Sequence, residues 1–259
     1  MKKASLGAWI ALIIGMLYFI LPLVGTLEFS LKMIRGTYSL EAYRVDLIDP
    51  EFQTTFLFST VIALMTIAAS VLIVVPTVYW VQLRLPRLRP IVEFITLLPL
   101  VIPAIVLVFG YLRLYNSSSW LPLTATSEST NILLLFAYVA LALPYMYRAV
   151  DSGMRTVDVR TLTEAAESLG AGLPTILFKV ILPNVRSAVL SGAFLTFAIV
   201  IGEFTIASLL DRPVFGTYLQ RIGAGKAYEP AALSVIAFGI TWASMGLMQF
   251  FGRDRRAAR

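Results

Sequence analysis

Residues 164–170 read EAAESLG and residues 180–183 read VILP, and both stretches lie in a polar interval between long apolar segments. This interval runs from about 151 to 187 and keeps the spacing of apolar residues that is typical of a helix. A simple connector of this length does not need such a pattern. The interval therefore predicts short helices at a membrane surface, held there for another protein to bind.

The first short helix is predicted over about 162–169. Thr161 and Glu164 have the spacing of a capping box, in which each side chain bonds a backbone N–H group at the start of a helix. Gly170 supplies the backbone freedom that ends such a helix. The two alanines after Glu164 leave a flat helix surface that another protein can approach closely.

A second helical piece is predicted from about Pro174 to Ile181, because proline is favoured near the start of a helix. Leu182 and Pro183 are expected to stop this piece and to redirect the chain toward the next apolar segment. The two pieces together would form a braced helix on which a push can reach the membrane.

The composition places the rest of the chain in a bilayer. Of the 259 residues, 58% are hydrophobic and 14% are charged, and the mean hydropathy is +0.82, which is too apolar for an ordinary soluble domain. A membrane span takes roughly 20 apolar residues. Six segments meet that length, and the alternation of a membrane β-barrel is absent, so the predicted fold is an all-α polytopic membrane protein with spans at about 7–31, 54–82, 90–114, 131–149, 188–210 and 230–251.

Basic residues predict the orientation, because cytoplasmic flanks carry an excess of lysine and arginine. Fourteen of the 21 basic residues lie on the side of the two termini, which are therefore predicted to be cytoplasmic; they are Lys2, Lys3, Arg84, Arg87, Arg89, Arg148, Arg155, Arg160, Lys179, Arg186, Arg253, Arg255, Arg256 and Arg259. The net charge of +6 follows from this topology, so no nucleic-acid partner is needed to explain it.

The first apolar run could be a cleaved secretory signal or a retained signal anchor. It is about 25 residues long, contains Pro22 and shows no small-residue cleavage site at its end, which favours a retained span. The chain has no cysteine and no histidine, which excludes disulfides, a thiol nucleophile, Ser-His catalysis and His/Cys metal sites.

Prolines fall inside several predicted spans. Pro76 interrupts the second, and Pro99 and Pro103 bend or break the third, since each removes a backbone hydrogen bond. Freed carbonyl groups in a bilayer must face protein or a water-filled cavity. Pro99 and Pro103 are thus candidates for lining a translocation pathway, and structural kinking is the alternative.

Glu203 is an acidic residue inside the fifth predicted span. A charge at bilayer depth costs about 2.5–3.5 kcal/mol on insertion scales, so such residues face a polar interior. Glu203 is therefore a candidate pathway residue, and the alternative is a glutamate that caps a helix or pairs inside the bundle, for example with Arg113 or Arg212.

The spacing of residues 164–170 and 180–183, their predicted cytoplasmic side and their place before the last two spans resemble the coupling loop of inner-membrane permease subunits of ABC importers. One departure is mild, because Val180 stands where isoleucine is frequent in the family. The resemblance covers essentially the whole chain and implies a single permease domain, 1–259. Its first span would pack against a partner permease, residues 54–251 would form the shared five-helix core, and residues 151–187 would be the cytoplasmic coupling loop.

The resemblance also implies partners and site residues. Two ATPase subunits would bind ATP and magnesium, a second identical or related permease would complete the path, and an extracytoplasmic solute-binding protein would deliver cargo. No cofactor site and no glycine-rich phosphate loop occur in this chain, so it is expected not to be an enzyme. The residues implied to couple the chain to the ATPase are Glu164, Ala165, Ala166, Gly170, Leu182 and Pro183.

The cargo expected from the sequence is a polyamine. The element at residues 202–204, with residues 212–218 after it, resembles the permease branch that serves polyamines, ferric iron, sulfate-like anions and aminophosphonates. A carboxylate at Glu203 favours a cation, so spermidine or putrescine is the first expectation and the other cargoes are alternatives. The remaining alternatives are a transporter driven by an ion gradient, for which residues 151–187 would have no role, and a membrane-embedded enzyme.

Overall fold

The structure is a computed structural model that describes the backbone of residues 6–253 and the side chains of residues 7–246. All the regular elements in this part of the chain are helices, which confirms the all-α prediction for it. The orientation of the termini was predicted in part from basic residues at the two chain ends. The side chains of these residues lie outside the described part of the chain; they are Lys2, Lys3, Arg253, Arg255, Arg256 and Arg259. The sidedness of the termini stays a prediction.

The chain divides into two compact units. The first is the chain up to Thr54 together with Tyr218–Ile240 and contains α1 (Leu6–Ser30) and α2 (Glu41–Ile48). The second is Thr55–Thr217 together with the chain from Thr241. Three helices belong partly to each unit; they are α3 (Pro50–Leu83), α12 (Phe215–Gly223) and α13 (Tyr228–Arg253).

The first unit is held by polar contacts near the helix ends. The hydroxyls of Ser30 and Tyr43 lie 2.6 Å apart, and the hydroxyl of Tyr218 donates to Asp49 at 2.8 Å. By contrast, the apolar window of α1 is not covered by any other part of the described chain. A helix of this composition without a protein neighbour has to be covered by lipid or by another chain.

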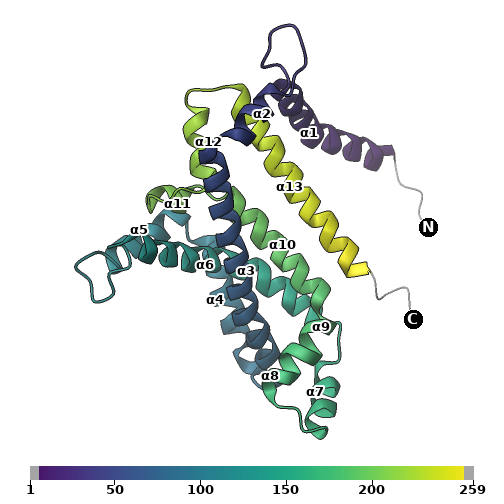
Figure 1. Cartoon of the computed structure of the whole chain (residues 1–259). Helices are drawn as coiled ribbons and strands as arrows, with labels where there is room; N and C mark the ends of the chain where they lie inside the picture. Colours follow the sequence, from purple (N-terminus) through teal and green to yellow (C-terminus); the bar gives the residue numbers. More distant parts are fainter. Residues whose placement is uncertain (1–5, 254–259) are drawn as a thin grey trace. The chain divides into compact units, whose positions relative to one another are not determined.

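In the second unit, α3 runs through Pro76 without the predicted break, while a bend at Pro76 stays a prediction. It lies near α6 (Ser127–Met154), which extends beyond the predicted fourth span at both ends. Close packing joins α6 to α10 (Arg186–Gly202) (Figure 1). A Cβ added to Gly153 would come within 2.2 Å of the Ala188 Cβ, so the glycine lets the two backbones approach.

The third predicted span is broken. After the short 3₁₀ turn η1 (Pro86–Leu88), α4 (Arg89–Val101) and α5 (Ala104–Leu114) meet at an angle of 100°. Pro103 stands directly before α5, while Pro99 lies inside α4. The predicted break is confirmed, and it falls at residues 102–103.

The fifth predicted span, 188–210, is wrong at its end. The helix α10 stops at Gly202, and a separate short helix, α11 (Thr205–Leu209), follows. Within the described residues, three helices are long and apolar enough to span a membrane, or five if each of the two bent helix pairs is one span. The sixth prediction coincides with α13, whose last side chains lie beyond this part, so the count of six stays a prediction.

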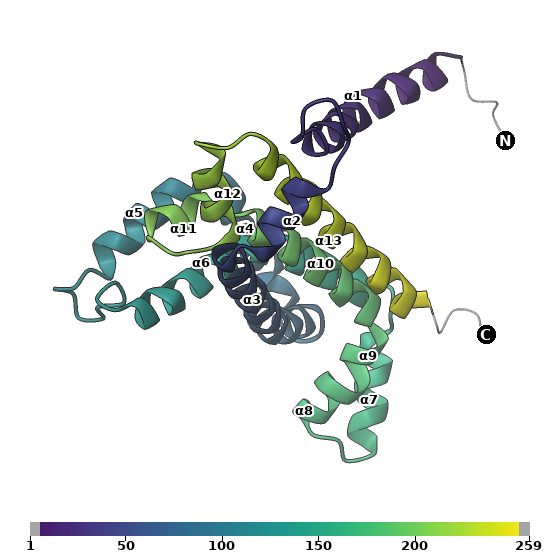
Figure 2. The ribbon, with the colours of Figure 1, turned by 45° about the horizontal axis from the view of Figure 1, so that its top comes forward.

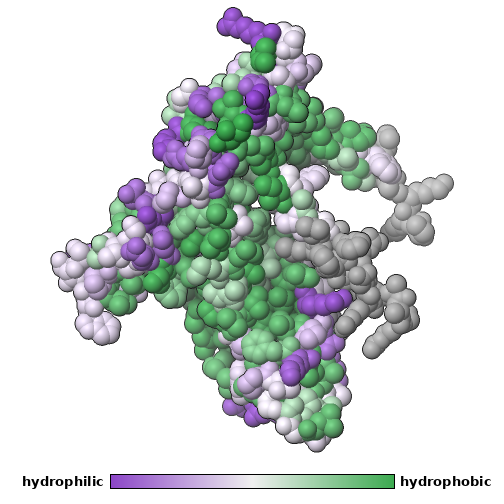
Figure 3. All heavy atoms as spheres, in the orientation of Figure 1, coloured by the Kyte–Doolittle hydropathy of each residue, from purple (hydrophilic) through white to green (hydrophobic). Residues whose placement is uncertain are grey.

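Two apolar clusters fill the second unit. One joins α3, α5, α6 and α11, and the other continues from α3 and α6 into the segment after α6. The face drawn in Figure 3 is broadly hydrophobic along α3, and hydrophilic and hydrophobic residues are mixed at the end where α7 (Val159–Ser168) and α8 (Leu173–Thr175) lie. The second of these clusters packs the segment after α6 against the apolar helices α3 and α6.

Candidate functional site

The predicted coupling loop forms a compact helical module, named here the 158–184 module. It contains α7 (Val159–Ser168), α8 (Leu173–Thr175), the π-helical stretch η2 (Ile176–Ile181) and α9 (Leu182–Asn184). These elements lie together at one end of the second unit in both ribbon views (Figures 1 and 2). The predicted pair of short helices is present.

The capping residue of α7 differs from the prediction. Asp158, not Thr161, caps the helix, and its carboxylate accepts the Thr161 backbone N–H at 3.1 Å and the Thr161 hydroxyl at 2.8 Å. These two hydrogen bonds lower the pKa of the Asp158 carboxyl below its usual value. Because an acidic cap lies three residues before Thr161, the helix begins at Val159. Glu164 has no capping role and pairs instead with Arg160 at 3.2 Å.

The end of α7 is as predicted. Gly170 has a φ of +78°, a conformation that favours glycine, and it directly follows the C-cap Leu169. Its N–H donates to the Glu167 carbonyl at 2.9 Å, and the Ala171 N–H donates to the Ala166 carbonyl at 3.0 Å. This pair of bonds is the Schellman motif, which satisfies the last carbonyls of a helix and turns the chain back.

The two faces of α7 have different surroundings. Ala166 is only 8% exposed and packs in the apolar cluster with Ile176 and Leu177 of η2. Its small side chain therefore serves the packing of the module. Glu164 and Ala165 are exposed, and so is Leu169, at 88%.

Leu169 was missed as a site residue. Single exposed leucines are common on protein surfaces, so the exposure of Leu169 makes it a candidate contact residue only because it lies beside the predicted coupling residues. Its place beside Gly170 in residues 164–170 was the available signal.

Leu182 and Pro183 do not stop the second helical piece, contrary to the prediction. The helix passes through both residues to Asn184, whose side chain donates to the Val180 carbonyl at 2.7 Å. The chain then turns by 82° at Val185 into α10. Proline near the start of the short α9 is compatible with helix, because its missing N–H is not needed there.

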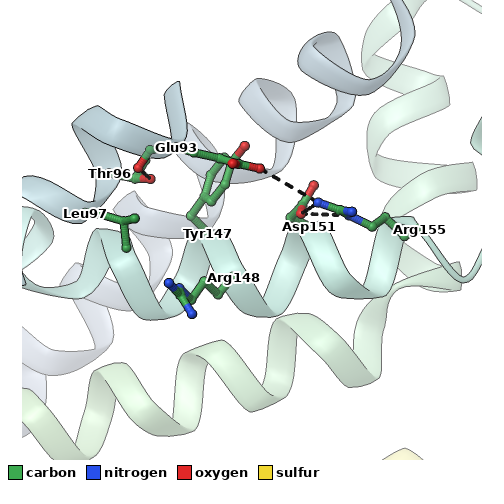
Figure 4. A pocket seen from close by; sticks show the side chains of 7 residues that line it. All are labelled: Glu93, Thr96, Leu97, Tyr147, Arg148, Asp151 and Arg155. Atoms are coloured by element: carbon green, nitrogen blue, oxygen red, sulfur yellow. Dashed lines mark hydrogen bonds and ion pairs between the residues drawn. The ribbon is translucent and has the colours of Figure 1, made fainter. Parts of the chain in front are cut away.

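Polar and charged residues join three apolar helices close to the start of the module. Asp151, near the end of α6, accepts hydrogen bonds from Gln82 of α3, Arg89 of α4 and Arg155. Arg89 also donates to Glu93 at 2.8 Å, and Figure 4 shows Glu93, Asp151 and Arg155 facing one another. These groups lie beside a cavity of about 220 Å³ between α4 and α6.

Glu203 follows α10 in an extended conformation and caps α11. Its carboxylate accepts the backbone N–H of Ile206 at 2.8 Å and that of Ala207 at 3.2 Å, and the Tyr138 hydroxyl donates to it at 3.1 Å. The capping alternative to a pathway role is thus observed. Its partners are neutral groups, and neither Arg113 nor Arg212 forms an ion pair with it among the described residues.

The described fold has long apolar helices, two bent pairs and a polar module packed onto the ends of the helices. This is the architecture of a membrane permease. The chain belongs to the family of binding-protein-dependent transport system inner membrane components, whose model matches residues 82–253. Members of this family are non-catalytic membrane subunits of ABC transporters.

Relatives in this family differ in what their names say they carry. A probable molybdenum ABC transporter permease of Haloferax volcanii is 29% identical over 196 residues, which are 75% of this chain and 70% of that protein. The spermidine/putrescine permease PotC of Escherichia coli is 32% identical over 126 residues, about half of each chain. A bacterial alginate ABC transporter solved with its periplasmic protein has a chain that matches with a TM-score of 0.71 at 14% identity, over 95% of this chain and 93% of that one.

Proposed function

We propose that this chain is a six-span permease subunit of an importer in a bacterial cytoplasmic membrane, with both termini in the cytoplasm, and that a separate ATPase drives it through the 158–184 module. The supporting observation is that one apolar cluster contains residues of α3, α6, α7 and η2. A push on α7 would therefore be passed to the spans rather than absorbed by a loose loop.

The face of the module that is directed away from the apolar helices is the proposed docking surface for the ATPase. Glu164, Ala165, Leu169 and Gly170 are exposed there, and burial of the Leu169 side chain by the partner would add apolar contact area. Ala166 and Leu182 act from beneath this surface by packing, while Pro183 is exposed on α9. ATP and magnesium would be bound by two ATPase subunits.

The other proposed partners follow from the family and from α1. A second permease, identical or related, would complete the path, and the uncovered apolar helix α1 would pack against it or against lipid. A solute-binding protein would deliver cargo from outside. Alternating access would be driven by closure of the ATPase pair on ATP.

The proposed cargo is a polyamine, with an oxyanion such as molybdate or sulfate as the second candidate. The polyamine is supported by the carboxylate of Glu203 and by the resemblance to PotC. The oxyanion is supported by the two molybdenum permeases among the relatives and by the neutral donors that already occupy Glu203. Pro99 and Pro103 stay candidate pathway residues because they flank the break between α4 and α5.

The test is cargo-stimulated ATP hydrolysis by the complex purified through a tag on this chain and reconstituted in lipid. Spermidine, putrescine, ferric ion, molybdate, sulfate and aminoethylphosphonate are each supplied on the binding protein. Stimulation by spermidine or putrescine, lost in Glu203→Gln, is the expected result. Stimulation by an oxyanion alone would make the oxyanion the cargo in place of a polyamine. If no ATPase co-purifies, the proposal that the chain is an importer subunit is rejected.

A further inference from the structure

Asp151 of α6 bonds residues of α3 and α4 a few residues before the start of the 158–184 module. Its side chain is nearly buried, and its Oδ1 accepts from Gln82 Nε2 of α3 at 3.1 Å. Its Oδ2 accepts from Arg89 of α4 at 3.0 Å and from Arg155 at 2.7 Å. Asp151 and Glu93 share Arg89 and Arg155, so the loss of either arginine leaves two acids with one positive partner.

Charged groups link α7 to α4 in addition to the apolar cluster, against which Val92 of α4 also packs. Arg155 lies only three residues before the cap Asp158, so a movement of α7 displaces Arg155 directly. Separately, Glu167 on α7 pairs with Arg84 at 3.4 Å, just before the turn that leads to α4. This second pair is exposed and adds little by itself.

Tyr147 stands one helical turn before Asp151 and is only 3% exposed. Its hydroxyl has no hydrogen-bond partner among the described residues. It lines the 220 Å³ cavity together with Glu93 and Arg155, and Figure 4 shows Tyr147 beside the Glu93 side chain. A buried hydroxyl without a hydrogen-bond partner costs free energy. A second arrangement in which the Tyr147 hydroxyl forms a hydrogen bond would remove that cost.

We propose that Asp151 is a positioning residue of a two-position switch between the 158–184 module and α4, and that Tyr147 holds the second position. In the first position, seen here, Arg155 pairs with Asp151 at 2.7 Å and with Glu93 at 3.8 Å, and this contact adds to the direct bond between Arg89 of α4 and Asp151 of α6. In the second position, the module pulls Arg155 away from Glu93. The Glu93 carboxylate then accepts a hydrogen bond from the Tyr147 hydroxyl, and α4, which carries Glu93, moves in the direction of the break at Pro103. A packed structure with two discrete hydrogen-bonding patterns converts a small shift of one element into a change between two conformations. This inference rests on the proposed function of the module.

The decisive variant is Tyr147→Phe, because the hydroxyl makes no bond in the first position. We expect the variant to keep or raise the melting temperature and to retain the co-purified ATPase of the unchanged complex, while cargo-stimulated ATP hydrolysis falls about fivefold or more. Tyr145→Phe, on the same helix, is the matched control and is expected to keep full stimulation. Asp151→Asn should lower the stimulation about tenfold with the ATPase retained.

A distance measurement reads the switch directly. The chain has no cysteine, so spin labels on Ile95→Cys in α4 and Ser152→Cys in α6, both exposed, report only that pair. We expect the distance between the labels to change when ATP and vanadate are added, and to stay constant when Tyr147→Phe is introduced.

The two proposals fail in different ways. Unchanged stimulation in Tyr147→Phe, an equal loss in Tyr145→Phe, or a label distance that still changes in Tyr147→Phe would overturn the switch. Absence of the ATPase from the unchanged complex would instead reject the module as its docking site. If Asp151→Asn does not fold, the tyrosine pair still decides.

Discussion

Gly216 lies against the backbone carbonyl of Glu203: a Cβ at position 216 would come within 2.4 Å of that oxygen. The carbonyl belongs to the turn that ends α10, and the Glu203 side chain caps α11 from the same turn. The glycine at 216 therefore belongs to the same small structure as the acid at 203. The two elements that suggested a permease branch in the sequence, residues 202–204 and 212–218, are joined in space by this contact.

Gly216→Ala is expected to destabilise the turn. The obstructing atoms are backbone, which cannot rotate away, so the chain must shift at a cost of about 1–3 kcal/mol. Thermal unfolding of the purified chain measures the loss. Gly202→Ala is the matched control, since a Cβ there meets nothing within 4 Å. Equal melting temperatures for the two variants would contradict the close contact.

Glu203→Ala is expected to cost more than Glu203→Gln. Alanine leaves the Ile206 and Ala207 N–H groups and the Tyr138 hydroxyl without their acceptor, at about 1–3 kcal/mol for a buried donor. Glutamine keeps one oxygen for the cap. The melting temperatures of the two variants test this order, and equal losses would mean that the charge, which both variants lack, is what stabilises the fold.

Gly170→Ala is expected to weaken the end of α7. A residue with a Cβ pays about 1–2 kcal/mol in the left-handed region, although the space around the position is open. Retention of the ATPase during purification should fall, because the exposed tip at Leu169 loses its fixed direction. Gly172→Ala, where φ is −77°, is the control and should retain the partner. If both variants retain the ATPase, the left-handed backbone conformation at Gly170 is not needed for binding.

The sequence predicted the helices of this chain better than their ends. Apolar stretches of about 20 residues marked most of the long helices, and Gly170 marked the end of α7, because both signals are local. The start of α7 was misplaced since two acceptable caps, Asp158 and Thr161, lie three residues apart. The stop at Pro183 was misplaced because proline near the start of a helical turn is tolerated.

The site was only partly predictable for a different reason. Asp151 and Arg89 are 62 residues apart in the sequence, and no local pattern brings them together. The same holds for Tyr138 and Glu203, 65 residues apart, so the sequence could offer only arginines as partners for the acid. Contacts of this kind depend on how α4, α6 and α10 pack, which is known only once the fold is known.

Glu164→Lys is expected to weaken ATPase binding about tenfold or more without unfolding the chain. The intrachain pair of Glu164 with Arg160 is exposed on both sides and contributes little to stability. Arg160→Gln breaks the same pair while keeping the acid, so it is the matched control and should retain the ATPase. Equal loss in both variants would show that the pair, rather than a contact of Glu164 with the partner, is what matters.

Asp46 on α2 is expected to make the stability of the chain depend on pH. It is 1% exposed, and its carboxyl oxygens have no hydrogen-bond partner among the described residues. Burial, and then the negative charges of Glu229 and Asp49, raise the pKa of Asp46 to about 7, against the opposing charge of Lys226. Tyr218 also faces this group.

An acid with a raised pKa binds more protons in the folded state than in the unfolded state, so stability is present at low pH and is lost as the pH rises from about 4 to about 7. The shift corresponds to about 4 kcal/mol at most. We expect the melting temperature to fall between pH 5 and pH 8, and Asp46→Asn to flatten that change. Asp158→Asn, whose parent carboxyl has a lowered pKa and titrates below this range, should leave the slope intact. A slope unchanged by Asp46→Asn would mean that Asp46 is ionised in the folded chain throughout this range.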